Sequence, residues 1–246
     1  MVPALLIGRG GSRGVPGKNT MKILGRPLMT YPILAAKNAR QVKQGFLSTD
    51  AEEIKEIGRA NGLEIINRPA ALSTDSALVE DVIVHAFQEM QIRMGHIEIF
   101  VLLFCNSATI MPGIIDKGIE VLKKDSSIDS AVSVSLYNEF SPVRAKRINA
   151  EGLIVPYGDI DSIPAASCDR DSAEPCYFCD CSAWILRSSC IDLDNGVLPF
   201  RWMGKKSVPL YQQGGLDIDH DYGIAMTEHW LIKNGFTETQ TPYDKQ

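Results

Sequence analysis

Three cationic side chains gather in one glycine-rich segment near the start of the sequence. Arg9, Arg13 and Lys18 lie within residues 8–19, which read GRGGSRGVPGKN. Glycines let backbone N–H groups approach a ligand closely, and the cations add charge-assisted hydrogen bonds. The segment therefore predicts a site for phosphate groups, and a flexible turn with solvated charges is the alternative interpretation.

Two familiar phosphate-binding loops do not match this segment. A Walker A loop needs glycine five residues before Gly17, where Ser12 stands, and Ser or Thr where Asn19 stands. A dinucleotide-binding fingerprint that begins at Gly8 needs glycine where Arg13 stands. The loop therefore belongs to another type.

Two carboxylates near the other end of the chain are candidates for holding a metal ion. Asp217 and Asp219 are two residues apart in an extended segment, so their side chains point to the same side. Paired carboxylates suit Mg²⁺ that is bound against phosphate oxygens. The alternative is that Asp217 is solvated and Asp219 only caps a helix, and we expect the cap in either case.

The elements that position these groups alternate between strand and helix. The apolar run Val2–Ile7 is typical of a strand buried on both faces of a parallel sheet, and it ends at the glycine-rich loop. The other predicted strands are 45–48, 63–66, 97–104 and 130–136, and the predicted helices are 28–39, 50–62 with Asp50 as N-cap, 77–90 and 113–124. This order predicts an α/β sandwich with a ligand crevice at the carboxyl ends of its strands.

The second half of the chain departs from this alternation. Segments 143–148 and 153–156 are expected to form a hairpin that stands off the main sheet, and strands 177–186 and 207–209 and a helix 219–232 come after it. The sequence contains no internal repeat or linker. We therefore predict a single domain over residues 1–246, with a protrusion at about residues 140–175.

Composition limits the classes of partner. The chain has 25 Lys and Arg against 30 Asp and Glu, a net charge of −5, so no overall cationic field attracts nucleic acid or anionic lipid. The apolar run at the N-terminus is too short for a signal peptide or a membrane span, which predicts a cytoplasmic protein. Five of six cysteines lie between residues 168 and 190. We interpret them as small buried hydrophobes in a strand, with a zinc site as the alternative.

The loop at residues 8–19 resembles the signature of the cytidylyltransferases that activate acidic sugars, typified by CMP-N-acylneuraminate synthetases. Their pattern is A-R-x-G-S-K-G-x-x-x-K-N, and here Gly8 replaces the alanine and Arg13 the lysine. The similarity continues at residues 22–28, 47–50, 68–69, 72–77 and 216–219. The resemblance implies a three-layer Rossmann-like nucleotidyltransferase fold with a mainly parallel central sheet and a hairpin that mediates dimerisation.

The same resemblance implies the reaction and the residues that carry it. CMP would be transferred from CTP to an acidic 2-keto-3-deoxy sugar, similar to sialic acid, with release of pyrophosphate and with Mg²⁺ as cofactor. Arg9, Lys18 and Asp219 are the implied catalytic residues, and Asp217 and Asp219 are the implied metal ligands. The implied nucleotide-binding residues are Gly8, Arg9, Gly10, Gly11, Ser12, Arg13, Lys18, Asn19, Arg68 and Ser76. The expected partners are CTP, a small acidic sugar and a second copy of the chain, without nucleic acid or membrane.

Departures from the family pattern concern the acceptor. Sialate enzymes usually read QPTSPLR after the central strand, where residues 104–110 read FCNSATI, and Asn-Gly-Ala where residues 181–183 read CSA. The expected acceptor-binding residues are Asn106, Ser107, Arg170 and Cys181. Because Phe104 and Ile110 replace an amide and a cation, transfer to a phosphonate or a sugar phosphate is one alternative. A nucleotide-binding protein without catalysis is the other.

Overall fold

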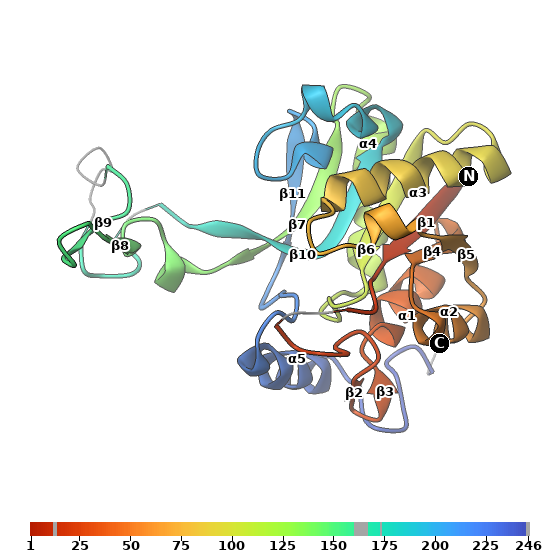
Figure 1. The fold of residues 1–246 in the computed structure, drawn as a ribbon, viewed down its shortest axis with the longest axis horizontal. Helices are drawn as coiled ribbons and strands as arrows, with labels where there is room; N and C mark the ends of the chain where they lie inside the picture. Colours follow the sequence, from red (N-terminus) through yellow and green to blue (C-terminus); the bar gives the residue numbers. More distant parts are fainter. Residues whose placement is uncertain (12–13, 160–166, 173, 245–246) are drawn as a thin grey trace.

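A seven-stranded sheet forms the centre of the computed structural model, which describes residues 1–11, 14–159, 167–172 and 174–244 (Figure 1). The strand order is β11-β7-β10-β6-β1-β4-β5. The strands are β1 (Val2–Ile7), β4 (Val42–Thr49), β5 (Glu64–Asn67), β6 (Ile99–Phe104), β7 (Ser130–Leu136), β10 (Tyr177–Arg187) and β11 (Ser207–Gln212). β10 runs antiparallel to both of its neighbours, and the other pairings in this sheet are parallel.

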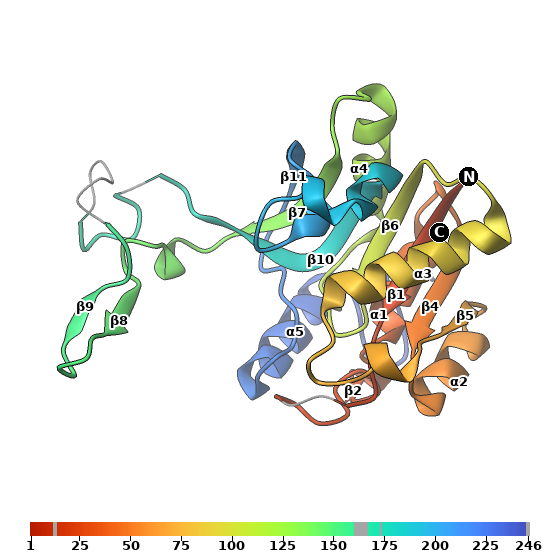
Figure 2. The ribbon, with the colours of Figure 1, turned by 45° about the horizontal axis from the view of Figure 1, so that its top comes forward.

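Helices cover both faces of the sheet, which confirms the predicted three-layer α/β fold (Figure 2). Helices α1 (Thr30–Asn38), α2 (Glu52–Ala60) and α4 (Pro112–Lys124) pack on one face. Helix α3 (Val79–Met94) packs on the other face with the 3₁₀ turns η3 (Ser188–Ile191), η4 (Leu193–Asn195) and η5 (Arg201–Met203). The last helix, α5 (Asp221–Lys233), packs with α1 and the glycine-rich loop in a third cluster.

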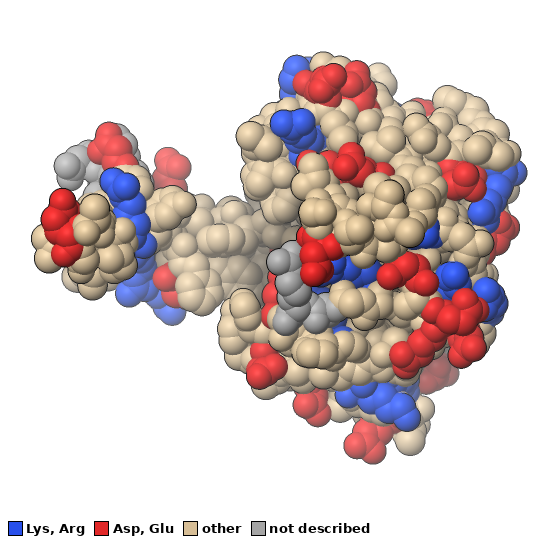
Figure 3. Space-filling view, viewed as in Figure 1, with Lys and Arg blue, Asp and Glu red and all other residues tan. Residues whose placement is uncertain are grey.

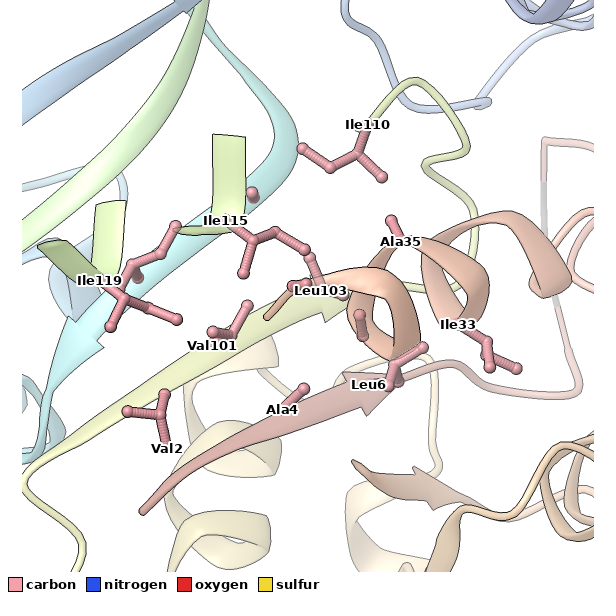
Figure 4. Packing of buried hydrophobic residues seen from close by; sticks show 14 of the residues in the cluster. Val2, Ala4, Leu6, Ile33, Ala35, Val101, Leu103, Ile110, Ile115 and Ile119 are labelled. Atoms are coloured by element: carbon pink, nitrogen blue, oxygen red, sulfur yellow. The ribbon is translucent and has the colours of Figure 1, made fainter. Parts of the chain in front are cut away.

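The alternation of side chains along β1 explains why its whole sequence is apolar. Val2, Ala4 and Leu6 face α1 and α4 (Figure 4), whereas Leu5 and Ile7 face α3. Every residue of β1 is buried. Because each buried aliphatic side chain contributes on the order of 1.5–3 kcal/mol, the strand is held firmly in the middle of the sheet. The loop that leaves its carboxyl end therefore starts from a rigid position.

The carboxyl end of β1 lies at the point where the chain changes direction across the sheet. From β1 the chain proceeds to β4 and β5 on one side, and then it crosses to β6 on the other side. Ligands of open parallel sheets bind at the carboxyl ends of the strands beside such a point. The fold therefore places the glycine-rich loop where a ligand is expected.

A long arm leaves the body between β7 and β10 (Figures 1 and 2). It begins with the 3₁₀ turn η2 (Asn138–Phe140) and carries β8 (Lys146–Ile148) and β9 (Ile154–Pro156), which pair in antiparallel fashion. This is the hairpin predicted from residues 143–156. The remaining short elements are β2 (Lys22–Ile23), β3 (Arg26–Pro27) and the 3₁₀ turn η1 (Ala70–Leu72).

Both predicted aspartate caps are wrong, for the same physical reason. The N-cap of α2 is Ala51, and Asp50 Oδ1 instead accepts a hydrogen bond from the Gly10 backbone N–H at 3.1 Å. The N-cap of α5 is His220, and the Asp219 carboxylate instead pairs with Lys18. Each carboxylate therefore binds a group of the glycine-rich loop in preference to the helix that comes after it.

Candidate active site

A cleft of about 330 Å³ opens beside the carboxyl end of β1. It brings together residues that are as much as two hundred positions apart, from the glycine-rich loop, the ends of β5 and β6, and the segment between β11 and α5. The charged and polar residues of its lining are Arg9, Lys18, Asn19, Arg68, Asn106, Asp217 and Asp219, with Gly8. Three of the candidate nucleotide-binding cations, Arg9, Lys18 and Arg68, thus face one cavity with both candidate metal ligands.

Lys18 joins the glycine-rich loop to the aspartate-bearing segment. Its Nζ atom donates hydrogen bonds to Asp219 Oδ1 and to the Ile218 carbonyl oxygen, each at 2.6 Å. The loop also lies directly against the backbone here, because a Cβ at Gly14 would be 2.2 Å from the Asp219 carbonyl oxygen. Glycine at position 14 is therefore required by a close approach.

Asp217 is a half-buried carboxylate at the base of the cleft. Its Oδ2 atom accepts a hydrogen bond from Asn106 Nδ2 at 3.0 Å, and the Ile218 N–H donates to the Asn106 carbonyl at 3.0 Å. Burial, and then repulsion from the neighbouring Asp219 carboxylate, raise the pKa of Asp217. A divalent cation would relieve this repulsion.

The oxygen donors of Asp217 and Asp219 fit Mg²⁺, a hard cation that is often held by one or two carboxylates together with substrate phosphates and water. Across the residues that the structure describes, no group of three or more His, Cys, Asp or Glu side chains is arranged to hold a metal ion. Substrate phosphates and water would complete the coordination of such an ion.

The remaining polar residues of the lining are tied to the loop. Arg9 Nη1 pairs with Asp75 Oδ1 at 2.9 Å, and Asn19 Nδ2 donates to the Arg9 carbonyl at 2.9 Å. Asn19 Oδ1 is buried and has no hydrogen-bond partner among the described atoms. Arg68 Nη2 donates to the carbonyl oxygens of Ser48 and Gly8 at 2.8 and 3.2 Å, and burial lowers its pKa. Arg68 thus links the start of the glycine-rich loop to the end of β4.

Among the described residues, three other predicted site residues, Gly10, Gly11 and Ser76, do not line the cleft. Gly10 and Gly11 are exposed in the loop, and Ser12 and Arg13 lie outside the described residues. Gly10 also lies close to the start of α2, since a Cβ there would be 2.7 Å from the Ala51 Cβ.

Ser76 is exposed, with its Oγ 3.2 Å from Thr74 Oγ1, in the same turn as the Asp75 that pairs with Arg9. The turn is thereby tied to the glycine-rich loop.

Of the four residues expected to bind the acceptor, two line the cleft and two do not. Asn106 and Cys181 line the cleft. Ser107 does not: it is fully buried, and its hydroxyl donates to the Leu216 carbonyl at 3.2 Å. Arg170 lies in the arm between β9 and β10, where its Nε is 3.2 Å from Asp171 Oδ2, and it does not line the cleft of its own chain.

Ile110 requires a correction as well. It was expected near the acceptor, but it is buried with Ile115 and Leu103 in the cluster on the α4 face of the sheet (Figure 4). A charged side chain at position 110 would therefore be buried in the core of this chain. The FCNSATI segment thus contributes to packing as well as to the cleft.

One wall of the cleft is apolar, and most of it was not predicted from the sequence. It is formed by Ile7, Val79, Val82, Phe104, Cys181, Phe200 and Trp202. The ring of Trp202 packs at 5.5 Å from Trp184 and 5.4 Å from Phe200, measured between centroids. The available signal was the pair of aromatic residues at positions 200 and 202, but only tertiary packing places their turn beside the cleft.

Cys181 lies in a distortion of β10 next to Asp217. The register of β10 shifts between Cys179 and Trp184, and Cys181 has a left-handed backbone with φ of 59°. This conformation costs a non-glycine residue about 1–2 kcal/mol, and such strain is concentrated at functional sites. Burial, and then the Asp217 carboxylate, raise the pKa of the Cys181 thiol. Cys181 therefore presents a neutral thiol to the cleft.

Beneath the loop, Gly8 and Cys105 lie in close contact. A Cβ at Gly8 would be 2.8 Å from both Cβ and Sγ of Cys105. The first residue of the glycine-rich loop is therefore packed against the segment that comes directly after β6.

Charge on the face shown in Figure 3 is mixed, with acidic and basic side chains interspersed over the body. This agrees with the net charge of −5. Positive charge in the cleft thus acts locally on a bound group. Within the described part of the chain, every helix is too short or too polar to cross a bilayer.

Comparisons with known proteins point to one family. A family profile described as cytidylyltransferase matches residues 3–157. N-acylneuraminate cytidylyltransferase of Oncorhynchus mykiss is 22% identical over 243 residues, covering 98% of this chain and 52% of that protein. A Helicobacter pylori protein named pseudaminic acid cytidylyltransferase and UDP-2,4-diacetamido-2,4,6-trideoxy-beta-L-altropyranose hydrolase is 26% identical over 144 residues, covering 56% of this chain and 28% of that protein.

Further matches extend this result. CMP-N,N'-diacetyllegionaminic acid synthase of Legionella pneumophila is 27% identical over 156 residues, covering 62% of this chain and 65% of that protein. A solved structure of CMP:2-keto-3-deoxy-manno-octonic acid synthetase complexed with CTP has a TM-score of 0.68 at 14% identity, covering 94% of this chain and 98% of that one. The latter shows a shared fold. The chain spans between about a quarter and two thirds of the length of these curated relatives.

Proposed function

The chain belongs to the cytidylyltransferase family, and from this premise we propose that it transfers CMP from CTP to an acidic 2-keto-3-deoxy sugar of the sialic-acid-like class. The observation that carries the proposal is the convergence of Arg9, Lys18, Asp217 and Asp219 on one cleft at the carboxyl edge of the sheet. The names of three relatives refer to N-acylneuraminate, pseudaminic acid and N,N'-diacetyllegionaminic acid, which supports an acidic sugar as acceptor. A cytoplasmic location is part of this proposal, because CTP is an intracellular nucleotide.

The glycine-rich loop would bind the triphosphate. Arg9 and Lys18 are each paired with a carboxylate in the unliganded chain, and phosphate oxygens are stronger alternative partners for both cations. Arg68 holds the Gly8 carbonyl and adds positive charge beneath the loop. The proposed nucleotide-binding set also includes Gly8, Gly10, Gly11, Asn19 and Ser76, together with Ser12 and Arg13.

In the proposed reaction an acceptor hydroxyl attacks the α-phosphorus of CTP in line. A new P–O bond forms as the bond to the pyrophosphate oxygen breaks, and the hydroxyl proton passes to solvent. Arg9 and Lys18 would neutralise charge that accumulates on the departing pyrophosphate. Asp217 and Asp219 would hold Mg²⁺, which supplies further charge neutralisation when it is bound.

The acceptor would lie between Asn106, Cys181 and the apolar wall. The Asn106 side-chain amide donates a hydrogen bond to Asp217, so an acceptor bound at Asn106 would be adjacent to the proposed metal ligands. Phe104 and Phe200 would contact apolar substituents of the sugar. Ser107 has a supporting part, because its buried hydroxyl holds the Leu216 backbone.

A homodimer is the proposed assembly. The arm exposes the apolar pair Ile148 and Ile154, which are 66% and 72% exposed and face each other across β8 and β9. Exposed apolar residues on a projecting hairpin favour burial against a second copy. Arg170 would then approach the partner's cleft rather than its own.

The proposed function is tested with purified protein, CTP and Mg²⁺. The acceptor panel contains 2-keto-3-deoxy sugar acids, a phosphonate and several sugar phosphates, and the measurements are pyrophosphate release and the mass of the product. A CMP-linked sugar acid is expected. A product formed only from a phosphonate or a sugar phosphate would assign the alternative acceptor. Binding of CTP with no pyrophosphate release from any acceptor would contradict a catalytic role.

A further inference from the structure

Asp180 is a buried carboxylate that has no part in the proposed reaction. Its side chain is only 5% exposed and lies in β10 just before the distortion at Cys181. Oδ1 accepts hydrogen bonds from Ser133 Oγ at 2.5 Å and from the Ser182 N–H at 3.1 Å. Oδ2 accepts from Ser135 Oγ at 2.7 Å and from Gln212 Nε2 at 2.9 Å. Both oxygens are therefore occupied by protein donors.

These bonds reach the segment that carries the two aspartates of the cleft. The Gly215 N–H donates to Ser135 Oγ at 2.9 Å, and Tyr137 Oη donates to the Gly215 carbonyl at 2.9 Å. The contact with Asp180 is also steric, because a Cβ at Gly215 would lie 2.4 Å from Asp180 Oδ2. Gly215 is thus seated directly on the Asp180 network, two residues before Asp217.

A second set of hydrogen bonds fixes the backbone of the next residue, Leu216. The Leu216 N–H donates to Thr109 Oγ1 at 2.9 Å, and Thr109 Oγ1 lies 3.1 Å from Ser182 Oγ. Ser182 is the residue whose N–H is bound by Asp180. The backbone at 215–216 is therefore held by one connected network of buried polar groups, and such networks resist rearrangement when every member is satisfied.

The backbone at 215–216 needs to be held because two like charges lie immediately beyond it. Asp217 and Asp219 face one cleft, and although Lys18 pairs with Asp219 the two carboxylates still repel each other, so they would move apart if the preceding backbone were free. The Asp180 bond to Ser182 also stabilises the left-handed backbone at Cys181, in the manner of an Asx turn.

We propose that Asp180 is a positioning residue, which fixes the backbone presenting Asp217 and Asp219 and thereby determines how tightly the cleft binds a divalent cation. This inference rests on the proposed function, because it takes the two aspartates as the metal ligands. An asparagine at position 180 would present an amide NH₂ to donors that now meet a carboxylate oxygen, and the network would open.

Asp116 supplies a matched control. It is 4% exposed, and it accepts the backbone N–H groups of Arg40 and Gln41 at 3.0 Å each, beside the amino end of β4. Asp116→Asn therefore disturbs an equally buried carboxylate at the opposite edge of the sheet. Gly215→Ala disturbs the same network as Asp180→Asn without changing a charge, because the added methyl group would collide with the Asp180 carboxylate.

The experiment compares Asp180→Asn, Gly215→Ala and Asp116→Asn with the wild type in two measurements. The first is amide hydrogen exchange of residues 214–219 in the metal-free protein. The second is Mn²⁺ affinity in the presence of CTP, measured by loss of the free Mn²⁺ signal in electron paramagnetic resonance. We expect faster exchange and about tenfold weaker Mn²⁺ binding in the first two variants, since loss of a group that orients metal ligands lowers metal affinity by about 10- to 100-fold. Asp116→Asn should change neither measurement, even where it lowers the melting temperature.

Turnover as a function of Mg²⁺ concentration adds a third measurement, in which the two network variants should need about tenfold more Mg²⁺ for half-maximal rate. Wild-type exchange and Mn²⁺ affinity in the two network variants would overturn the inference, as would equal effects of Asp116→Asn. Gly215→Ala decides the matter if Asp180→Asn does not fold. If the wild type binds Mn²⁺ with CTP but forms no product, the proposed function fails while the positioning role is still decided by the first two measurements. If the wild type binds no Mn²⁺, the inference is wrong.

Discussion

Lys18 Nζ lies 2.6 Å from Asp219 Oδ1, in an ion pair that joins residues 201 positions apart. The pair joins the cation proposed for the triphosphate to a carboxylate proposed for the metal. In the unliganded chain each group therefore neutralises the other. Binding of the nucleotide to Lys18 would release Asp219, so affinity for nucleotide and affinity for metal should be coupled.

Lys18→Ala tests this coupling. The variant should bind CTP about 10- to 100-fold more weakly, the effect of losing a charge-assisted hydrogen bond. In the absence of nucleotide the same variant should bind Mn²⁺ more tightly, because Asp219 loses its competing partner. Calorimetry with CTP tests the weaker nucleotide binding, and electron paramagnetic resonance with Mn²⁺ tests the tighter metal binding. Lys123→Ala, which removes an exposed lysine bonded to Gln41, is the control. Parallel loss of both affinities would contradict the coupling.

Asp217→Asn should lower turnover and raise the melting temperature of the metal-free protein. Because the pKa of Asp217 is raised in the folded chain, its ionised form destabilises the fold; this cost is fully present above the folded pKa, decreases as the pH falls through it, and is gone below the unfolded pKa. The variant should therefore melt at a higher temperature than the metal-free wild type near neutral pH, and the difference should shrink in acid. Turnover should fall by orders of magnitude. A lower melting temperature at neutral pH would show that the charge is not a source of strain.

Gly14→Ala should disable the loop without unfolding the protein. The new Cβ would lie 2.2 Å from the Asp219 carbonyl oxygen, so the loop must move away from the aspartate segment. We expect a higher KM for CTP and a lower kcat, with a melting temperature near that of the wild type. Gly113→Ala in α4, where the added Cβ meets no atom within 4 Å, provides the control. Wild-type kinetics for Gly14→Ala would show that the contact is dispensable.

Phe104→Gln should alter the choice of acceptor. Phe104 is partly exposed on the apolar wall, so a polar amide there weakens contact with apolar substituents and offers new hydrogen bonds. The KM for the acceptor should change while the KM for CTP stays within about twofold, because we propose that the nucleotide binds on the loop side of the cleft. Phe104→Leu keeps an apolar wall and should resemble the wild type. A change confined to the KM for CTP would place the nucleotide base against Phe104 instead.

Ile154→Glu should separate the proposed dimer. A charge in the middle of the exposed apolar pair on β8 and β9 would have to be buried without a partner in any interface formed there. Light scattering should then report a monomer where the wild type is a dimer, with CTP binding retained. Ile92→Glu alters a residue of α3 that is 78% exposed and should leave the assembly unchanged. A wild type that is already monomeric at micromolar concentration would contradict the proposed assembly.

Sequence patterns predicted the elements well where burial is two-sided or periodic. The run Val2–Ile7 was placed correctly because both faces of a central strand must be apolar. The strand predicted at 45–48 extends over Val42–Thr49, since Val42 and Gln44 pair with β1 although they are not fully buried. Local periodicity shows where a strand is buried, whereas pairing decides where it ends.

Contacts between distant residues account for the errors. Asp50 and Asp219 have the sequence context of helix caps, but the loop offers an N–H and an ammonium group that bind them instead. Ile110 replaces a cation that the family pattern places near the acceptor, but it is buried against α4, which depends on the packing of two elements. The turn that carries Phe200 and Trp202 reaches the cleft only because Trp184 lies next to it in the folded sheet.

The contact between Gly8 and Cys105 links two departures that look independent along the chain. Gly8 stands where the family pattern has alanine, and Cys105 belongs to the altered segment after β6, yet a methyl group on the first would meet the second at 2.8 Å. A chain with alanine at position 8 must therefore move the Cys105 side chain or have a different residue at position 105. Positions 8 and 105 are therefore coupled, and we expect a graft of residues 104–110 from a relative to need that relative's residue at position 8 as well.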